Sequence, residues 1–177
     1  MNNTTLARES FEYIKLGKVR FIGIDVWRTG EDWDALWERS DEYMPALDAL
    51  AIEYGTEITT PCSMMHHNGN EVDSENHFLA GRFFKAGTSV PEGYDYYDVP
   101  TENAAYAVYA TNKYDGALGS AYYTTRDKIL ADGVGIPYPH AYWHAEVYTD
   151  GRPHEGNYRF GYMFSVDKKA GDLTTEK

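Results

Sequence analysis

The sequence predicts an α+β fold of two β-α-β-β repeats, with antiparallel strands, helices on one face and a ligand cleft between the repeats. Three observations lead to this prediction. Short segments of alternating apolar and polar residues, typical of strands, recur along the chain. A longer segment with helical spacing follows the first strand of each half. The order strand, helix, strand, strand then occurs twice, which favours two similar units in one α+β domain.

The first half contains one helix and three strands, with an extended segment after them. The strands are predicted at residues 20–27, 56–65 and 76–85, and the extended segment at 94–99. The helix is expected to begin after Gly30, because Glu31 and Asp32 then lie in its first turn, near the positive end of the helix dipole. Pro45 is expected to kink or break this helix. Residues 67–70 read as a turn.

The second half repeats this order. Strands are predicted at residues 104–111, 140–149 and 157–166, and a helix at 118–131, ended by the glycines that follow it. Repeat one then spans about 18–85 and repeat two about 104–167, while 1–17 form a lead-in with one or two helical turns and 168–177 a charged tail. We expect the sheet face opposite the helices to build the cleft at the junction of the repeats.

The strand at residues 140–149 has the most informative side chains. Alternation places Tyr142, His144, Glu146 and Tyr148 on one face. A carboxylate among aromatic rings suits a flat, lipophilic cation, because the rings supply cation–π attraction and the acid supplies the counter-charge. Glu146 could instead pair with a tyrosine hydroxyl or with Arg159, and His144 could be an ordinary strand histidine.

Composition narrows the function classes. The chain has 177 residues and a formal net charge of −12, which disfavours binding to nucleic acid. Aromatic residues make up 15% of the chain and include 16 tyrosines, which suits an adaptable binding surface. Cys62 is the single cysteine, so an internal disulfide is excluded. With no apolar signal or membrane-length segment, we expect a cytoplasmic protein with no membrane contact. His66, His67 and His77 hint at a metal site, but adjacent strand histidines point to opposite faces and no acid–histidine motif is clustered, so we expect no metal, and no cofactor.

Several segments between residues 18 and 167 resemble, in order and spacing, the GyrI-like small-molecule-binding family, also known as the effector-binding domain of bacterial transcription activators. They are 19–24, 36–39, 45–47, 78–81, 90–93, 99–100, 106–109 and 145–148. The resemblance implies two repeats around a cleft in which acids and aromatic walls bind cationic, lipophilic compounds. It places the family's strand glutamate at Glu146 and the associated tyrosine at Tyr148.

The chain departs from this family pattern in two ways. A second family glutamate, in the last strand, falls at Gly161 here, which implies a roomier pocket with one principal acid. No DNA-binding domain is expected, so the chain resembles a stand-alone member.

The candidate ligand-binding residues combine the acidic strand with aromatic side chains from both repeats. They are Glu146, Tyr148, Tyr142, His144, Trp27, Trp37, Tyr122 and Phe83. Trp37 and Tyr122 occupy matching places in the two predicted helices. Plain core packing is the alternative for each aromatic ring.

Three functions are compatible with this sequence. The preferred one is a stand-alone binder of small, amphipathic, cationic aromatic compounds, acting in drug or toxin sequestration or in effector sensing. The family also implies a hydrolase of strained, cyclopropane-containing toxins, in which Glu146 and Tyr148 would act as the catalytic groups. The third is a protein-interaction inhibitor of the gyrase-inhibitor type. The partner is expected to be a small molecule, and the oligomeric state, with a dimer as one option, stays open.

Overall fold

The computed structural model describes residues 5–56, 58, 60–67, 76–100, 102–112, 116–136, 143–148 and 158–167. Within these residues, an eight-stranded sheet has the order β1-β6-β8-β7-β3-β4-β2-β5, and every pair of neighbouring strands is antiparallel. The predicted charged tail at 168–177 lies outside the described residues, as does most of the turn predicted at 67–70.

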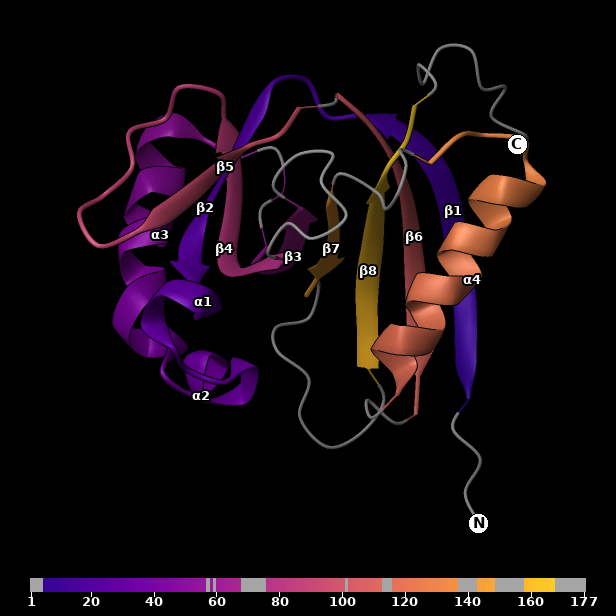
Figure 1. Cartoon of the computed structure of the whole chain (residues 1–177), viewed down its shortest axis with the longest axis horizontal. Helices are drawn as coiled ribbons and strands as arrows, with labels where there is room; N and C mark the ends of the chain where they lie inside the picture. Colours follow the sequence, from indigo (N-terminus) through magenta and orange to yellow (C-terminus); the bar gives the residue numbers. More distant parts are fainter. Residues whose placement is uncertain are drawn as a thin grey trace.

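The predicted α+β class with two β-α-β-β units is confirmed. Repeat one consists of β2 (Val19–Asp25), α1 (Val26–Thr29), α2 (Trp33–Glu38), α3 (Ser40–Tyr54), β3 (Cys62–His67) and β4 (Asn76–Lys85). Repeat two consists of β6 (Asn103–Thr111), α4 (Ala117–Ala131), β7 (Trp143–Val147) and β8 (Tyr158–Ser165). The strand orders β3-β4-β2 and β7-β8-β6 run outward from the β3–β7 pair, so the two repeats are related across this central pair (Figure 1).

The sheet ends in two strands that flank the repeats, β1 (Leu6–Lys15) and β5 (Asp95–Asp98). The prediction of helical turns in the lead-in is wrong, because β1 is a ten-residue edge strand paired along its length with β6. Its side chains are mostly exposed, and its register with β6 shifts between Arg8 and Ser10. An exposed edge strand with such an irregularity lacks the clean alternation by which a strand is recognised in a sequence.

The helical segment of repeat one is divided into three pieces, and the break expected at Pro45 is not there. Helix α1 begins where Asp25 caps it by accepting a hydrogen bond from the Trp27 amide, 2.9 Å away. Helix α2 ends at Glu38 and α3 begins at Ser40, so the break falls at Arg39, while Pro45 lies inside α3. Gly30, at φ 70°, supplies the left-handed turn that ends α1.

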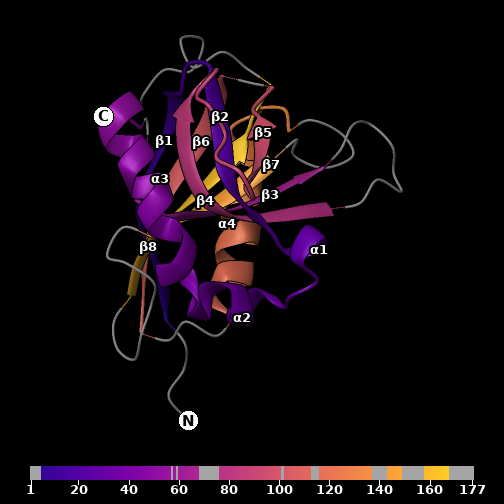
Figure 2. The same cartoon turned by 90° about the vertical axis from the view of Figure 1, so that its left-hand side faces the viewer.

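Helices cover one face of the sheet in both repeats (Figures 1 and 2). Leu36 and Leu47 of α2 and α3 pack with Ala80 and Phe84 of β4, and Ala121 of α4 packs in a second cluster with residues of β6 and β8. The turned view in Figure 2 brings α1, α2 and α3 to the front. No helix in the described part of the chain combines the length and apolar character needed to cross a membrane.

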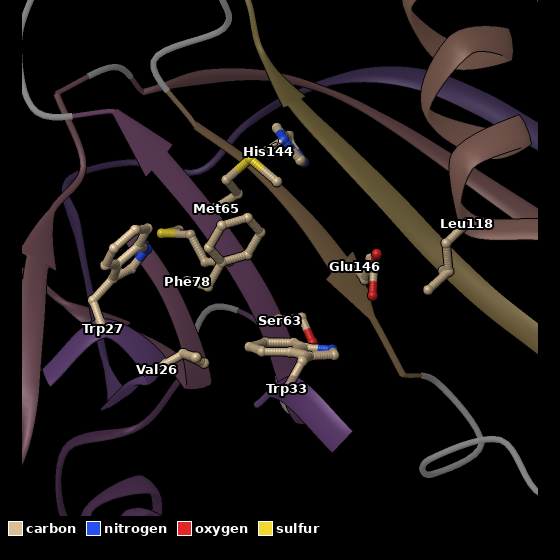
Figure 3. Close-up of a pocket in the computed structure, with 10 residues that line it drawn as sticks. Val26, Trp27, Trp33, Ser63, Met65, Phe78, Leu118, His144 and Glu146 are labelled. Atoms are coloured by element: carbon tan, nitrogen blue, oxygen red, sulfur yellow. Dashed lines mark hydrogen bonds between the residues drawn. The ribbon is translucent and has the colours of Figure 1, made fainter. Parts of the chain in front are cut away.

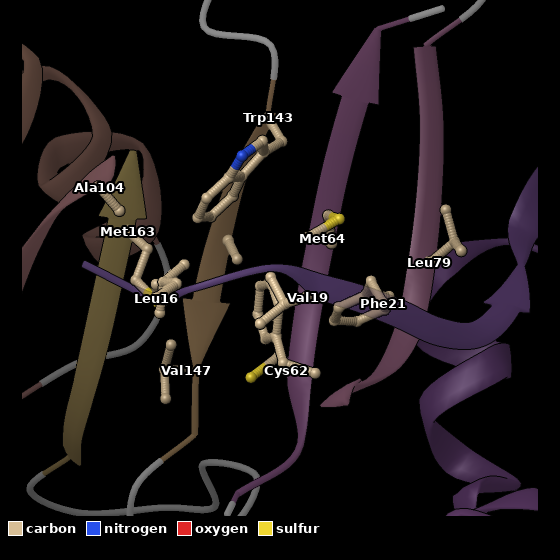
Figure 4. Close-up of a cluster of buried hydrophobic side chains, with 12 residues drawn as sticks. Leu16, Val19, Phe21, Cys62, Met64, Leu79, Ala104, Trp143, Val147 and Met163 are labelled. Atoms are coloured by element: carbon tan, nitrogen blue, oxygen red, sulfur yellow. The ribbon is translucent and has the colours of Figure 1, made fainter. Parts of the chain in front are cut away.

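The opposite face of the sheet carries a third apolar cluster (Figure 4). It joins both repeats, since Phe21 and Phe83 from β2 and β4 pack with Trp143 from β7. Phe83 and Trp143 are fully buried there. This face is therefore closed by core packing rather than open for a ligand.

Candidate functional site

A cavity of about 460 Å³ lies over the central strands β3 and β7, between the helices of the two repeats. Seven apolar residues line it: Val26, Trp27, Trp33, Met64, Met65, Phe78 and Leu118. They come from α1, α2, β3, β4 and α4, and the volume is ordinary for a small-molecule site. The cavity lies on the helix-covered face, so the expectation that the cleft would occupy the opposite face is wrong. The helices stand apart over β3 and β7, and that gap is where the cavity forms.

Three polar residues, Ser63, His144 and Glu146, complete the described lining (Figure 3). Glu146 is central because β7 pairs with β3 on one side and with β8 on the other. Its direct neighbours across these ladders are Ser63 and Tyr162. In Figure 3 its carboxyl lies between Leu118 of α4 and the ring of Trp33 of α2.

The Glu146 carboxyl is held by a chain of two hydrogen bonds. The Tyr148 hydroxyl donates to Oε2 of Glu146 over 2.7 Å. The Ser63 and Tyr148 hydroxyl oxygens are 2.6 Å apart, and because the single proton of Tyr148 is already donated, Ser63 is the donor in that bond. Tyr148 is itself fixed by its amide, which donates to the Pro61 carbonyl, and by edge-on packing against Trp37 at 5.1 Å.

The surroundings of Glu146 disfavour its charged form. Burial raises the pKa of its carboxyl from 4.5 to about 7, and the hydrogen bond from Tyr148 opposes this rise without cancelling it. Burial also raises the pKa of the neighbouring Tyr162 well above its usual value, with a further contribution from the Glu146 charge. The acid therefore titrates near neutral pH, whereas Tyr162 keeps its proton.

His144 is engaged on both sides of its ring. Its Nδ1 lies 2.8 Å from the Tyr162 hydroxyl and its Nε2 lies 3.1 Å from the Met65 sulfur. A thioether has no proton to donate, so Nε2 carries the proton, and in the neutral ring Tyr162 then donates to Nδ1. Both bonds are satisfied by a neutral imidazole. This ring adds a polar edge to the cavity without requiring a charge.

The aromatic residues predicted to bind the ligand differ in where they lie relative to the cavity. Trp27 lines the cavity and is 57% exposed, as expected for a ring at an entrance. Trp37 is buried behind Tyr148, and Tyr122 packs behind His144 at 5.2 Å, so both support residues of the cavity from a second layer. Phe83 lies in the core on the opposite face of the sheet, away from the cavity. Tyr142 lies outside the described residues.

Several residues of the lining were absent from the sequence prediction. Trp33 and Phe78 form an aromatic wall, with ring centroids 6.2 Å apart. Met65 of β3 adds a flexible apolar side chain to the lining, and Leu118 of α4 adds a branched one. The alternation of β4 was a usable signal for Phe78, because it separates Phe78 from Phe83. Trp33 had no comparable signal, since its orientation depends on where α2 begins.

The position of Gly161 also differs from the expectation. It pairs with Val147 and Val108, and alternation along β8 places it on the face opposite Glu146 and Tyr162. A Cβ built at this residue would overlap the Tyr106 ring. A glutamate at 161 would therefore not reach the cavity, and Gly161 serves the packing of Tyr106 instead.

His66 of β3 and His77 of β4 lie on that same opposite face. His66 and His77 stack at 5.0 Å, and His77 Nδ1 is 2.6 Å from Asp25. Among the described residues, no group of three or more histidine, cysteine, aspartate or glutamate side chains has a metal-binding arrangement.

Comparison with known proteins finds no matching family model and no matching curated protein. Solved structures do match. A Staphylococcus aureus MU50 protein provisionally assigned to bacterial transcription regulation is 13% identical, with a TM-score of 0.57 over 90% of this chain and 99% of that one. The structure of SAV2435 bound to tetraphenylphosphonium is 12% identical, with a TM-score of 0.60 over 89% of this chain and 94% of that one. At these identities the likeness shows a shared fold, in agreement with the predicted α+β class.

Proposed function

We propose that this protein binds small, amphipathic, cationic aromatic compounds in the cavity over β3 and β7, as a sequestering or sensing protein. The observation that carries the proposal is the carboxyl of Glu146, the one acid among the described lining residues, within an apolar, aromatic lining. A carboxylate in such a place is costly without a partner, and a lipophilic cation supplies both the charge and the apolar surface. The similar fold of SAV2435, whose structure contains tetraphenylphosphonium, supports this choice of ligand class.

The shape of the lining suits a bulky monocation. Trp27, Trp33 and Phe78 offer ring faces for cation–π contact, each contributing about 0.5–2 kcal/mol. Met65 can adapt to ligands of different outline, because thioether side chains are flexible and polarisable. With one carboxylate in the described lining, two or three such contacts support affinities near micromolar, about −8 kcal/mol.

A fluorescence titration with a rhodamine-type cationic dye tests the proposal. At a pH above about 8, where Glu146 is ionised, we expect saturable micromolar binding that weakens at least tenfold in Glu146→Gln. Glu38→Gln is the matched control, because it removes the same charge from an exposed position on α2. Equal affinity of the wild type and Glu146→Gln would reject the role of Glu146, and absence of binding to all three proteins would reject the cation site.

The position of Glu146 also favours hydrolysis as a second candidate function. An acid with a pKa of about 7 beside a tyrosine hydroxyl is suited to deprotonate water or protonate a leaving atom near neutral pH. Water would then add across a strained, electrophilic bond of a ligand held in the cavity. Incubation with a cyclopropane-type electrophile, followed by mass spectrometry, tests this function: a hydrated product that disappears in Glu146→Gln supports it, and unchanged substrate with the wild type rejects it.

A further inference from the structure

The protonation of Glu146 bears on which ligands the cavity accepts. Oε2 accepts the hydrogen bond from Tyr148, and within the described residues Oε1 accepts none. A carboxylic acid proton therefore belongs on Oε1, from which it can be donated to a ligand. The protonated acid is a hydrogen-bond donor, and the ionised acid is an anion.

Among the residues that the structure describes, the groups around this carboxyl offer no permanent positive charge. From β7 they are Tyr148 and His144, from β8 Tyr162, from β3 Ser63, and from α4 Leu118 with Tyr122 behind it. Tyr162 stays protonated and His144 satisfies both of its contacts as a neutral ring. No lysine or arginine is among the described residues that line the cavity. Burial without a basic partner disfavours the charged form of a carboxyl.

We propose that the cavity exchanges a proton for a cation at Glu146, so that it accepts two ligand classes: lipophilic monocations when Glu146 is ionised, and neutral ligands with a strong hydrogen-bond acceptor when it is protonated. This inference rests on the proposed function and adds a second ligand class to it. On cation binding, the O–H bond at Oε1 breaks, the proton leaves to solvent and the carboxylate pairs with the ligand. On binding of a neutral acceptor, the proton stays on Oε1 and is donated to the ligand.

The raised pKa of Glu146 supports this exchange, because its value of about 7 lets both forms be populated near neutral pH. Apparent affinity scales with the fraction of protein in the competent state. If only the ionised form binds cations, their affinity should be about 30-fold tighter at pH 8.5 than at pH 5.5. Neutral acceptors should show the opposite trend over the same range.

Methyltriphenylphosphonium and triphenylphosphine oxide form a matched pair of probes. They share three phenyl rings, neither titrates in this range, and they differ by a methyl group with a positive charge against a neutral P=O acceptor. Calorimetric titrations between about pH 5.5 and about pH 8.5 should show the phosphonium binding about 30-fold more tightly at the upper end. The phosphine oxide should bind at least threefold more weakly there, as it loses a hydrogen bond. At about pH 5.5, where Glu146 is almost fully protonated, buffers of different ionisation enthalpy should report release of nearly one proton with the phosphonium and almost none with the oxide.

Glu146→Gln separates the possible outcomes. We expect this variant to lose the pH dependence of both probes and to retain the oxide, because the glutamine amide can donate to P=O. Phosphonium binding by the wild type with no pH dependence would overturn the exchange and leave the cation site standing. A pH dependence that persists in Glu146→Gln would assign the proton to another group and overturn the proposal. Absence of phosphonium binding at every pH would instead reject the proposed function itself.

Discussion

The hydroxyl of Tyr148 donates to Oε2 of Glu146 over 2.7 Å, and this bond is the described contact that favours the charged form of the acid. Tyr148→Phe should therefore raise the pKa of Glu146 above 7. Loss of a hydrogen bond to a charged group corresponds to a rise of about one pH unit. The measurement is the midpoint of the pH dependence of phosphonium affinity.

The control for that experiment is Ser63→Ala. Ser63 acts on the acid only through Tyr148, so its removal should shift the midpoint less than Tyr148→Phe does. A midpoint that stays in place in Tyr148→Phe would show that the hydroxyl does not tune Glu146.

Glu146 also links the stability of the fold to pH. Its pKa is about 7 in the folded chain against 4.5 for an ordinary glutamate, so between these values the folded state binds more protons than the unfolded state. The free energy of unfolding should thus fall as pH rises from about 4.5 to about 7, with this contribution fully present below the lower value and lost above the higher one. The change is on the order of 3 kcal/mol.

Urea unfolding of wild type and Glu146→Gln at half-unit steps of pH measures this change as the difference between the two curves of unfolding free energy against pH. Parallel curves would mean that the acid is already ionised when the cavity is empty.

Two phenylalanines of the same strand give a paired test of the cavity face. Phe78 lines the cavity, whereas Phe83 is fully buried in the cluster on the other face. Phe78→Leu should weaken binding of the cationic dye by about 2- to 30-fold, through loss of a ring contact worth about 0.5–2 kcal/mol. Phe83→Leu should lower stability by about 1 kcal/mol and leave affinity unchanged. Dye titration measures the effect of each variant on affinity, and thermal unfolding measures its effect on stability. The reverse pattern would place the ligand on the face of the sheet that carries Phe83.

Two of the three tryptophans of repeat one, Trp27 and Trp37, should differ in their effects on affinity and stability. Trp27→Ala removes a ring that is 57% exposed, so it should cost affinity for the dye with little change in melting temperature. Trp37→Ala removes a ring that is 4% exposed and packs on Tyr148, and it should lower stability by about 3–5 kcal/mol. If Trp27→Ala bound the dye like the wild type, Trp27 would not be part of the binding surface.

Gly161 tests the packing on the far side of the sheet. Gly161→Ala should lower stability by about 1–3 kcal/mol, because the new Cβ would overlap the Tyr106 ring. Tyr106→Ala in the same chain should recover part of this loss, so that the two substitutions are non-additive. Chemical denaturation of both single variants and the double variant measures the coupling, and strict additivity would contradict the contact.

Much of the fold could be predicted because the strands of the two repeats are rich in buried apolar and aromatic residues. The alternation in β4 and β8 and the helical spacing of α4 gave bounds within a residue or two of those observed. The edge strand β1 could not be predicted in this way, since most of its side chains are exposed and its register shifts near Arg8. Helix α1 has four residues, too few to show any period.

The candidate site could be predicted in part for a similar reason. Alternation put His144 and Glu146 together, and both line the cavity. It could not say which face of the sheet the helices cover, and this decides between Phe78 and Phe83. Those two residues are five positions apart on one strand, an odd number, so they lie on opposite faces. Gly161 was misplaced in the same way, because a one-residue difference in register exchanges the faces of a strand.

The β3–β7 ladder, from Cys62–Val147 to His66–Trp143, is both the floor of the cavity and the junction of the two repeats. On the opposite face this junction is reinforced by a shared apolar cluster, whereas on the helix face it is spanned by the cavity. A bound ligand would contact α1 and α2 of repeat one and α4 of repeat two, and would thereby stabilise the association of the two repeats. Occupancy of the cavity should therefore slow amide hydrogen exchange along β3 and β7 more than at the distant edges β1 and β5.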